Sequence, residues 1–208
     1  ATVDEIERGG GRAVALGADL AREEEVQALL PAAEAALGPV DCLVNNAAAF
    51  DRDSVASVTR ASWDAHMETN LRAPFVLIQA LADRLPEGWS GNVINILDER
   101  VWNPTPHFVS YTVSKSALWT LTQTMALALA PRIRVNGIGP GAFPSAMNRA
   151  ARDHGDAVAQ GIPAKRIGYD EDMAGTAIYL ASRAGDYVVG DTITVDSLSE
   201  EVGAKISL

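Results

Sequence analysis

Tyr111 and Lys115 are spaced so that their side chains can act together. They close the two ends of Tyr111-Thr112-Val113-Ser114-Lys115, at the start of a stretch of good helix formers. Residues four apart in a helix lie one turn apart on the same face. A cation there stabilises a phenolate and lowers the tyrosine pKa, which suits the phenol to general acid and base catalysis. The chain has four tyrosines, and about 0.06 such pairs are expected by chance. An exposed pair of side chains without a catalytic part is the alternative.

Further polar residues stand where apolar runs end. Asn45-Asn46-Ala47 closes one run, and the segment from Arg134 to Gly141 closes another, while Asn70 lies within a helical pattern. Each has a purely structural alternative. Asparagines at strand ends can satisfy backbone groups, and Pro140-Gly141 can be a simple turn.

The elements that must position these residues alternate along the chain. Apolar runs separated by longer helical patterns are typical of β-α-β units in a mostly parallel sheet. The expected strands are 12–16, 42–46, 92–96, 134–138 and 192–195, and the expected helices are 23–37, 62–85, 111–130 and 170–185. The sequence therefore predicts an α/β fold, a Rossmann-type doubly wound parallel sheet. We expect the strand at 42–46, including Cys42, to be buried.

Composition and charge restrict the class of protein. The 208 residues are 48% hydrophobic and 21% charged, which indicates one globular domain, expected over 1–196, followed by an atypical tail at 197–208. The formal net charge of −10 disfavours binding to nucleic acid or to an anionic membrane surface. No apolar stretch is long enough to cross a bilayer.

The cysteine and histidine residues indicate the cellular compartment and give no sign of a metal centre. The single cysteine suits a reducing compartment, so a cytoplasmic location is expected. His66, His107 and His154 lack the spacing of metal ligands and are interpreted as surface or helix residues. We therefore expect no metal site.

Taken together, the motifs resemble a known family. Asn-Asn-Ala, Tyr-x3-Lys and the Arg-Val-Asn…Pro-Gly strand end occur in the order and at the spacing of the short-chain dehydrogenases/reductases, and the resemblance runs from the first residue to about Asp196. It implies an NAD(P)(H)-dependent oxidoreductase that moves a hydride to a C=O or C=N bond of a small-molecule substrate. It also implies NADP or NAD as cofactor, with NADPH favoured, and a homo-oligomer, dimer or tetramer.

The resemblance assigns roles by position. Tyr111 would donate or accept the proton, Lys115 would lower its pKa and hold the nicotinamide ribose, and Asn70 would anchor a water in the proton relay. The residues expected to contact the cofactor, besides Tyr111 and Lys115, are Asp19 at the adenine, Asn45 and Ala47 at the floor, and Pro140, Gly141 and Ser145 at the carboxamide. Asp19 could instead be an acid in a turn.

One departure from the family concerns the phosphates. The glycine-rich loop between the first strand and helix is not found, because Gly9-Gly10-Gly11 follows a helical pattern and the glycines at 137–141 include Pro140. The first βαβ portion is thus expected to be missing, and with it the cradle for the pyrophosphate. An inactive fragment, or a relative that serves nucleotide binding or assembly, is the alternative from another class.

A second departure is Asp98, thirteen residues before Tyr111, where most of the family has serine. A carboxylate cannot donate a hydrogen bond to an oxyanion, but it can relay a proton to a ring nitrogen or carbon. This arrangement resembles pteridine and dihydromonapterin reductases, and the aromatic residues that could stack on a pterin are Trp102, Phe108 and Phe143. Such aromatics are more often plain packing. The segment 141–191 resembles 3-oxoacyl-thioester reductases instead, so the substrate class stays open.

Two of the expected helices have apolar residues on more than one face. In 111–130 these include Val113, Leu118, Leu121 and Met125. One face can cover the sheet while the other meets a partner helix, so helices 62–85 and 111–130 are expected to form a surface between subunits.

Overall fold

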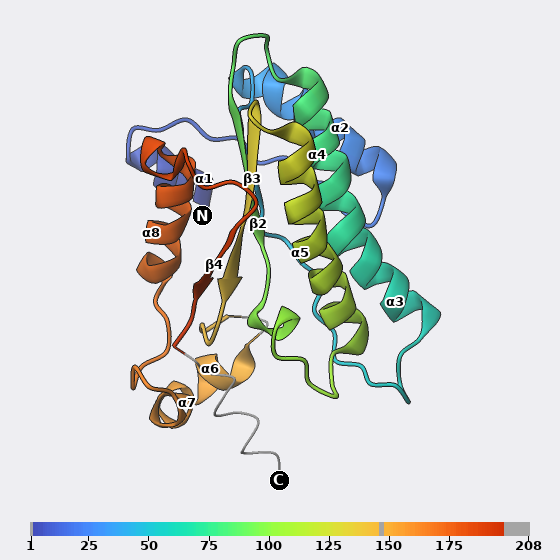
Figure 1. Ribbon diagram of the computed structural model, residues 1–208, viewed down its shortest axis with the longest axis vertical. Helices are drawn as coiled ribbons and strands as arrows, with labels where there is room; N and C mark the ends of the chain where they lie inside the picture. Colours follow the sequence, from blue (N-terminus) through green and yellow to red (C-terminus); the bar gives the residue numbers. More distant parts are fainter. Residues whose placement is uncertain (1, 146–147, 198–208) are drawn as a thin grey trace.

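A parallel sheet lies at the centre of the fold (Figure 1). The computed structural model describes residues 2–145 and 148–197, and within them the sheet has four strands in the order β1-β2-β3-β4. The strands are β1 Cys42–Asn45, β2 Gly91–Ile96, β3 Ile133–Pro140 and β4 Thr192–Val195. All neighbouring pairs are parallel, so every connection is a crossover through helices. The predicted Rossmann-type parallel sheet is confirmed.

Helices cover both faces of the sheet. Helix α4, Ala73–Arg84, packs on β1 and β2, α5, Val109–Leu129, packs on β3, and α8, Asp170–Ala181, covers the opposite face (Figure 1). The remaining helices are α1 Thr2–Arg8, α2 Glu23–Leu37, α3 Arg60–Met67, α6 Arg149–Asp153 and α7 Gly155–Gly161. Shorter turns are π-helical at Glu68–Arg72 and 3-10 at Glu99–Val101 and Arg183–Gly185.

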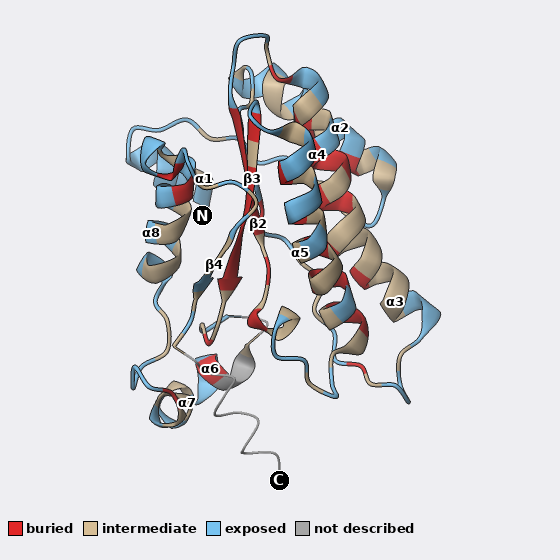
Figure 2. Cartoon of the chain, in the orientation of Figure 1, coloured by how far each residue is buried: buried red, intermediate tan, exposed pale blue. Residues whose placement is uncertain are grey.

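Side chains on the two faces of β2 pack into two separate parts of the core. Successive strand residues point to opposite faces, so Val93 joins the cluster with Ile78 and Leu81 of α4, while Ile94 packs with Leu180 of α8. Figure 2 shows β2 and β3 as the most continuously buried segments of the chain. Burying each such side chain contributes about 1.5–3 kcal/mol. This core holds the carboxyl ends of the strands, where β2 leads to Asp98, in a fixed place.

Most predicted elements are found, with shifted bounds. The helix expected at 62–85 is α3, a π-helical turn and α4, and the helix expected at 170–185 ends at Ala181 before a 3-10 turn. The strand expected at 134–138 extends to Ile133–Pro140. The part of the predicted tail at 198–208 lies outside the described residues.

The predicted strand at 12–16 is wrong. These residues form no regular element, and Val14 and Leu16 are each about two-fifths exposed. A strand requires a hydrogen-bonded neighbour, and no strand of the described chain pairs with this segment.

The strand predicted at 42–46 is found at Cys42–Asn45, but the prediction that it is buried is wrong. In the described sheet β1 has a neighbour on one side only, so Cys42 and Val44 are exposed while Asn45 is buried. The interpretation of Cys42 as a small buried hydrophobe fails for the same reason.

Candidate active site

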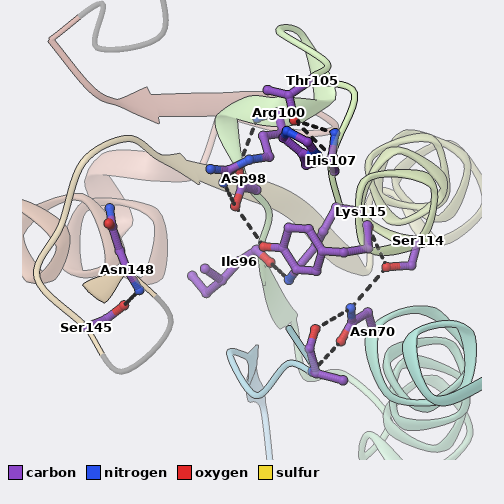
Figure 3. A network of polar contacts seen from close by, with 12 residues as sticks. Asn70, Ile96, Asp98, Arg100, Thr105, His107, Ser114, Lys115, Ser145 and Asn148 are labelled. Atoms are coloured by element: carbon purple, nitrogen blue, oxygen red, sulfur yellow. Dashed lines mark hydrogen bonds and ion pairs between the residues drawn. The ribbon is translucent and has the colours of Figure 1, made fainter. Parts of the chain in front are cut away.

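Three predicted site residues meet beyond the carboxyl end of β2. Asp98 follows this strand, and Tyr111 and Lys115 lie in the first two turns of α5. The Tyr111 hydroxyl donates to Asp98 Oδ2 at 2.8 Å, and Lys115 Nζ donates to the Ile96 carbonyl at 2.7 Å (Figure 3). The Lys115 ammonium is 5.9 Å from the centre of the Tyr111 ring. The structure thus brings a phenol, a carboxylate and an ammonium together.

The surroundings of Tyr111 favour its protonated form. Burial raises the pKa of Tyr111 far above its ordinary value, and the charge of Asp98 and the hydrogen bond to it raise the pKa further. The Arg100 guanidinium acts in the opposite direction and only partly offsets these effects. The net direction differs from the expectation that Lys115 lowers this pKa. Tyr111 is therefore a proton donor held on an acceptor.

Lys115 has a depressed pKa for one main reason. Its side chain is buried, which disfavours the ammonium and lowers the pKa to about 8, while the nearby charge of Asp98 opposes the decrease. At neutral pH the side chain is still mostly cationic. Lys115 therefore places a positive charge close to both Tyr111 and Asp98.

Arg100 is part of this site although the sequence did not single it out. Its backbone N–H donates to Asp98 Oδ1 at 2.9 Å, and its Nη1 lies 3.2 Å from each carboxylate oxygen. The guanidinium lies over two aromatic rings, 5.3 Å from the centre of Phe108 and 5.8 Å from that of Phe50. A cation two residues after the carboxylate was the signal available in the sequence. Arg100 fixes the orientation of Asp98.

Asn70 lies in the π-helical turn between α3 and α4. Its amide donates to the Ala49 carbonyl at 3.0 Å and accepts from the Ala49 N–H at 2.8 Å. It also donates to Ser114 Oγ at 3.0 Å, and Ser114 in turn donates to the Tyr111 carbonyl (Figure 3). Asn70 thus ties the segment after β1 to the helix that carries Tyr111, and its part in a water relay stays a prediction.

The residues expected to contact the cofactor are distributed along the strand ends. Asn45 donates to Asn95 at 2.8 Å inside the sheet, and Ala47 is exposed just beyond it. Pro140 ends β3, and the Gly141 N–H donates to the Val195 carbonyl at 3.1 Å.

Gly141 has no room for a side chain, because an added Cβ would collide with Asp196. Ser145 is exposed, and its hydroxyl accepts the Asn148 N–H at 3.0 Å. Asp19 is exposed and accepts the Ala21 N–H at 2.9 Å in a turn. The roles of these residues stay predictions.

The three aromatic residues proposed for substrate stacking have different neighbours. Phe108 stacks on Phe50, with ring centres 4.6 Å apart, and Phe50 meets the Tyr111 ring edge-on at 4.6 Å. Trp102 packs on Trp119 and covers Gly139, where an added Cβ would lie 2.7 Å from the indole. Of the three, Phe108 packs on a ring, that of Phe50, which itself contacts Tyr111.

Phe143 lies elsewhere, in a cavity of about 410 Å³ beside β4 that is also lined by Arg166 and Ile193. None of Asp98, Tyr111 and Lys115 lines this cavity. We place the chemistry at Tyr111, because the hydroxyl of Tyr111, the carboxylate of Asp98 and the ammonium of Lys115 meet there and not in this cavity.

His66 was interpreted as a surface or helix residue. It lies in helix α3 and is fully buried, so the helix alternative holds for it. In the part of the chain that the structure describes, no three histidine, cysteine or acidic side chains are grouped to hold a metal ion. No described helix is both long enough and apolar enough to span a membrane.

Comparison with known proteins agrees with this geometry. The family model described as enoyl-(acyl carrier protein) reductase matches residues 1–197. The 2-dehydro-3-deoxy-D-gluconate 5-dehydrogenase of Dickeya dadantii is 35% identical over 200 residues, which cover 94% of this chain and 79% of that protein. The 3-oxoacyl-[acyl-carrier-protein] reductase FabG of Staphylococcus epidermidis is 34% identical, covering 94% and 81% respectively.

A solved structure is similar over the same range. FolM alternative dihydrofolate reductase 1 from Brucella canis, complexed with NADP, superposes with a TM-score of 0.85 at 36% identity, covering 96% of this chain and 78% of that one. A matching family model, relatives above 30% identity and the Tyr111, Lys115 and Asp98 geometry lead to one assignment. This chain belongs to the short-chain dehydrogenase/reductase family of oxidoreductases.

Proposed function

We propose that the protein is an NADPH-dependent reductase of a C=N bond in a pteridine-like ring. The observation that carries the proposal is the 2.8 Å hydrogen bond from Tyr111 to Asp98, at the position where most of the family has serine. Similarity to a dihydrofolate reductase of the same fold, solved with NADP, supports both the substrate class and the cofactor.

The side chains at the site suit proton delivery to nitrogen. Bound NADPH would supply the hydride, which adds to the carbon of the C=N bond, and Tyr111 would give its proton to the nitrogen, so that an amine is formed. The tyrosinate left behind faces the carboxylate of Asp98, and two adjacent negative charges are unfavourable. Reprotonation of Tyr111 from solvent is therefore strongly favoured, and the Lys115 cation lowers the electrostatic cost of the tyrosinate.

The chain's residues fit one half of the cofactor better than the other. Lys115 has three N–H donors, of which one bonds the Ile96 carbonyl, so the other two suit the nicotinamide ribose. The phosphates have no comparable cradle in the described residues. Helix α2 begins with three glutamates, whose charges repel a phosphate at that helix N-terminus.

A 3-oxoacyl-thioester reductase is the second candidate, favoured by the 34% identity to FabG. An enzyme of that kind must stabilise an oxyanion, and the Asp98 carboxylate cannot donate a hydrogen bond for it.

The two candidates are separated by NADPH oxidation assays on the full-length gene product with a 7,8-dihydropteridine and a 3-oxoacyl thioester. Our proposal predicts a higher kcat/KM for the dihydropteridine. A preference for the thioester would replace the proposal by the second candidate.

A further inference from the structure

A buried chain of polar groups lies beside Tyr111 and outside the site described above. It consists of Asp53, Ser110 and His66, of which Ser110 and His66 have no exposed surface and Asp53 is 4% exposed. Ser110 Oγ donates to Asp53 Oδ2 in a short hydrogen bond, and His66 Nδ1 lies 2.7 Å from Ser110 Oγ. The Asp51 N–H donates to His66 Nε2 at 3.0 Å.

These contacts determine where the histidine proton is. Because Nε2 accepts a backbone N–H, it carries no proton, so a neutral His66 must carry its proton on Nδ1. Nδ1–H then donates to Ser110 Oγ, whose own proton goes to the Asp53 carboxylate. Every donor in the chain of contacts is therefore used in one direction, from His66 through Ser110 to Asp53.

Asp53 also caps the N-terminus of α5, which has no side-chain cap from its own preceding residue. The residue before α5, Phe108, has a left-handed conformation with φ 60° and offers no side-chain cap. Asp53, from the segment after β1, accepts the Ser110 N–H on Oδ1 at 3.3 Å and the Phe108 N–H on its carbonyl at 2.8 Å. A carboxylate at a helix N-terminus is stabilised by the N–H groups and by the helix dipole.

The same segment touches the reacting side chain. Phe50, three residues before Asp53, meets the Tyr111 ring edge-on at 4.6 Å, and the His66 ring is 6.0 Å from that of Tyr111. Segment 49–53 is thus bonded at both ends, through Asn70 to the π-helical turn and through Asp53 to the start of α5. Movement of either end would move the wall against which Tyr111 is packed.

We propose that His66, Ser110 and Asp53 form a positioning network that caps α5 from a neighbouring loop and thereby sets the position of Tyr111. None of the three touches the reacting atoms. The network holds the Tyr111 hydroxyl on Asp98. Its predicted effect on turnover rests on the proposed function, but the geometry of the network is independent of that function.

The first test uses wild-type, full-length protein and needs no substrate. Nitrogen NMR of histidine-labelled protein should show His66 as the neutral tautomer protonated on Nδ1. Observation of the Nε2-protonated tautomer, or of free exchange between both forms, would overturn the network.

The second test compares Ser110→Ala with Thr122→Ala. Thr122 is also fully buried in α5, where it donates to the Leu118 carbonyl and accepts from Asn95, so both variants remove one buried hydroxyl from the same helix. Ser110→Ala should speed hydrogen exchange at the Ser110 and Tyr111 amides by roughly 10-fold or more relative to Thr122→Ala, the effect expected for one lost buried hydrogen bond. Equal exchange at those amides in both variants contradicts the proposal.

The third readout is turnover. With a dihydropteridine, Ser110→Ala should lower kcat by about 10- to 100-fold without changing the dissociation constant of NADPH, because a small displacement of the donor affects only the chemical step. An equal loss of NADPH affinity would show a general structural defect and refute a positioning role. If no dihydropteridine is turned over at all, the proposed function fails while the tautomer and exchange results still decide the network.

Discussion

Replacing Asp98 by serine perturbs the feature that sets this protein apart from most of its family. In Asp98→Ser the Tyr111 hydroxyl loses the charged carboxylate that accepts its 2.8 Å hydrogen bond, and Arg100 loses the carboxylate that its Nη1 contacts at 3.2 Å. The Tyr111 pKa should fall, since the charge of Asp98 and the hydrogen bond to it both raise it. Tyr111 would then be a less firmly oriented donor for a ring nitrogen.

The expected size of the effect follows from these contacts. A hydrogen bond to a charged group contributes about 1.5–3 kcal/mol, which corresponds to roughly 10- to 150-fold in rate. Loss of a proton-transfer group typically costs 10²–10⁴-fold, or about 3–5 kcal/mol. We therefore expect dihydropteridine reduction to fall by about 10²–10⁴-fold in kcat, with nearly unchanged binding of NADPH.

The assay is NADPH oxidation by the full-length gene product under saturating cofactor, with Asp98→Asn as the matched control. Asparagine keeps the size and one acceptor oxygen without the charge, so its rate should lie between those of wild type and Asp98→Ser. Simple ketone reduction should improve in Asp98→Ser, because a serine hydroxyl can donate to an oxyanion. Dihydropteridine turnover that stays intact in Asp98→Ser would refute the reasoning and leave Asp98 as a strand-end acid.

Three further predictions concern stability, cofactor binding and assembly. The pKa of Lys115 is about 8 in the folded protein and 10.5 in the unfolded chain, so burying its ammonium costs about 3 kcal/mol of stability below pH 8, and this cost declines as the pH rises. Lys115→Met should therefore be more stable than wild type in denaturant titrations at pH 7, by a margin that shrinks toward pH 10. A margin that stays constant with pH would contradict this. The 208-residue chain should bind NADPH weakly or not at all, since its described residues offer the phosphates no helix N-terminus with a glycine-rich turn; micromolar binding in a fluorescence titration would count against it. The helical segments 62–85 and 111–130 should form a surface between subunits. Leu127 of α5 is 87% exposed, so Leu127→Glu should shift sedimentation toward monomer. A wild type that is monomeric at high concentration would disprove the surface.

The sequence predicted those parts of the fold that depend on local patterns. Strands β2 and β3 were expected at 92–96 and 134–138 and are found at Gly91–Ile96 and Ile133–Pro140. The helix carrying Tyr111 was expected at 111–130 and is found at Val109–Leu129. The strand at 12–16 failed because an apolar run becomes a strand only beside a partner. The exposure of Cys42 follows from the position of β1 at the edge of the described sheet.

The site was predictable where a motif encoded it. The spacing of Asp98, Tyr111 and Lys115 predicted that their side chains lie close together, since a strand end and the first turns of the next helix are adjacent in this topology. Arg100 and His66 were missed because their parts depend on contacts rather than spacing. His66 meets Ser110, 44 residues further along the chain, and a lone histidine in a helical pattern gives no sign of such a partner.

The most direct test of the account is the reduction rate of a dihydropteridine by NADPH in a single turnover, compared between the full-length wild-type gene product and its Tyr111→Phe variant. Phenylalanine preserves the ring that packs on Phe50 and removes only the hydroxyl that donates to Asp98. The account predicts a loss of about 10²–10⁴-fold with unchanged NADPH affinity, because the proton donor alone is removed. A Tyr111→Phe protein that reduces the dihydropteridine at the wild-type rate would contradict it.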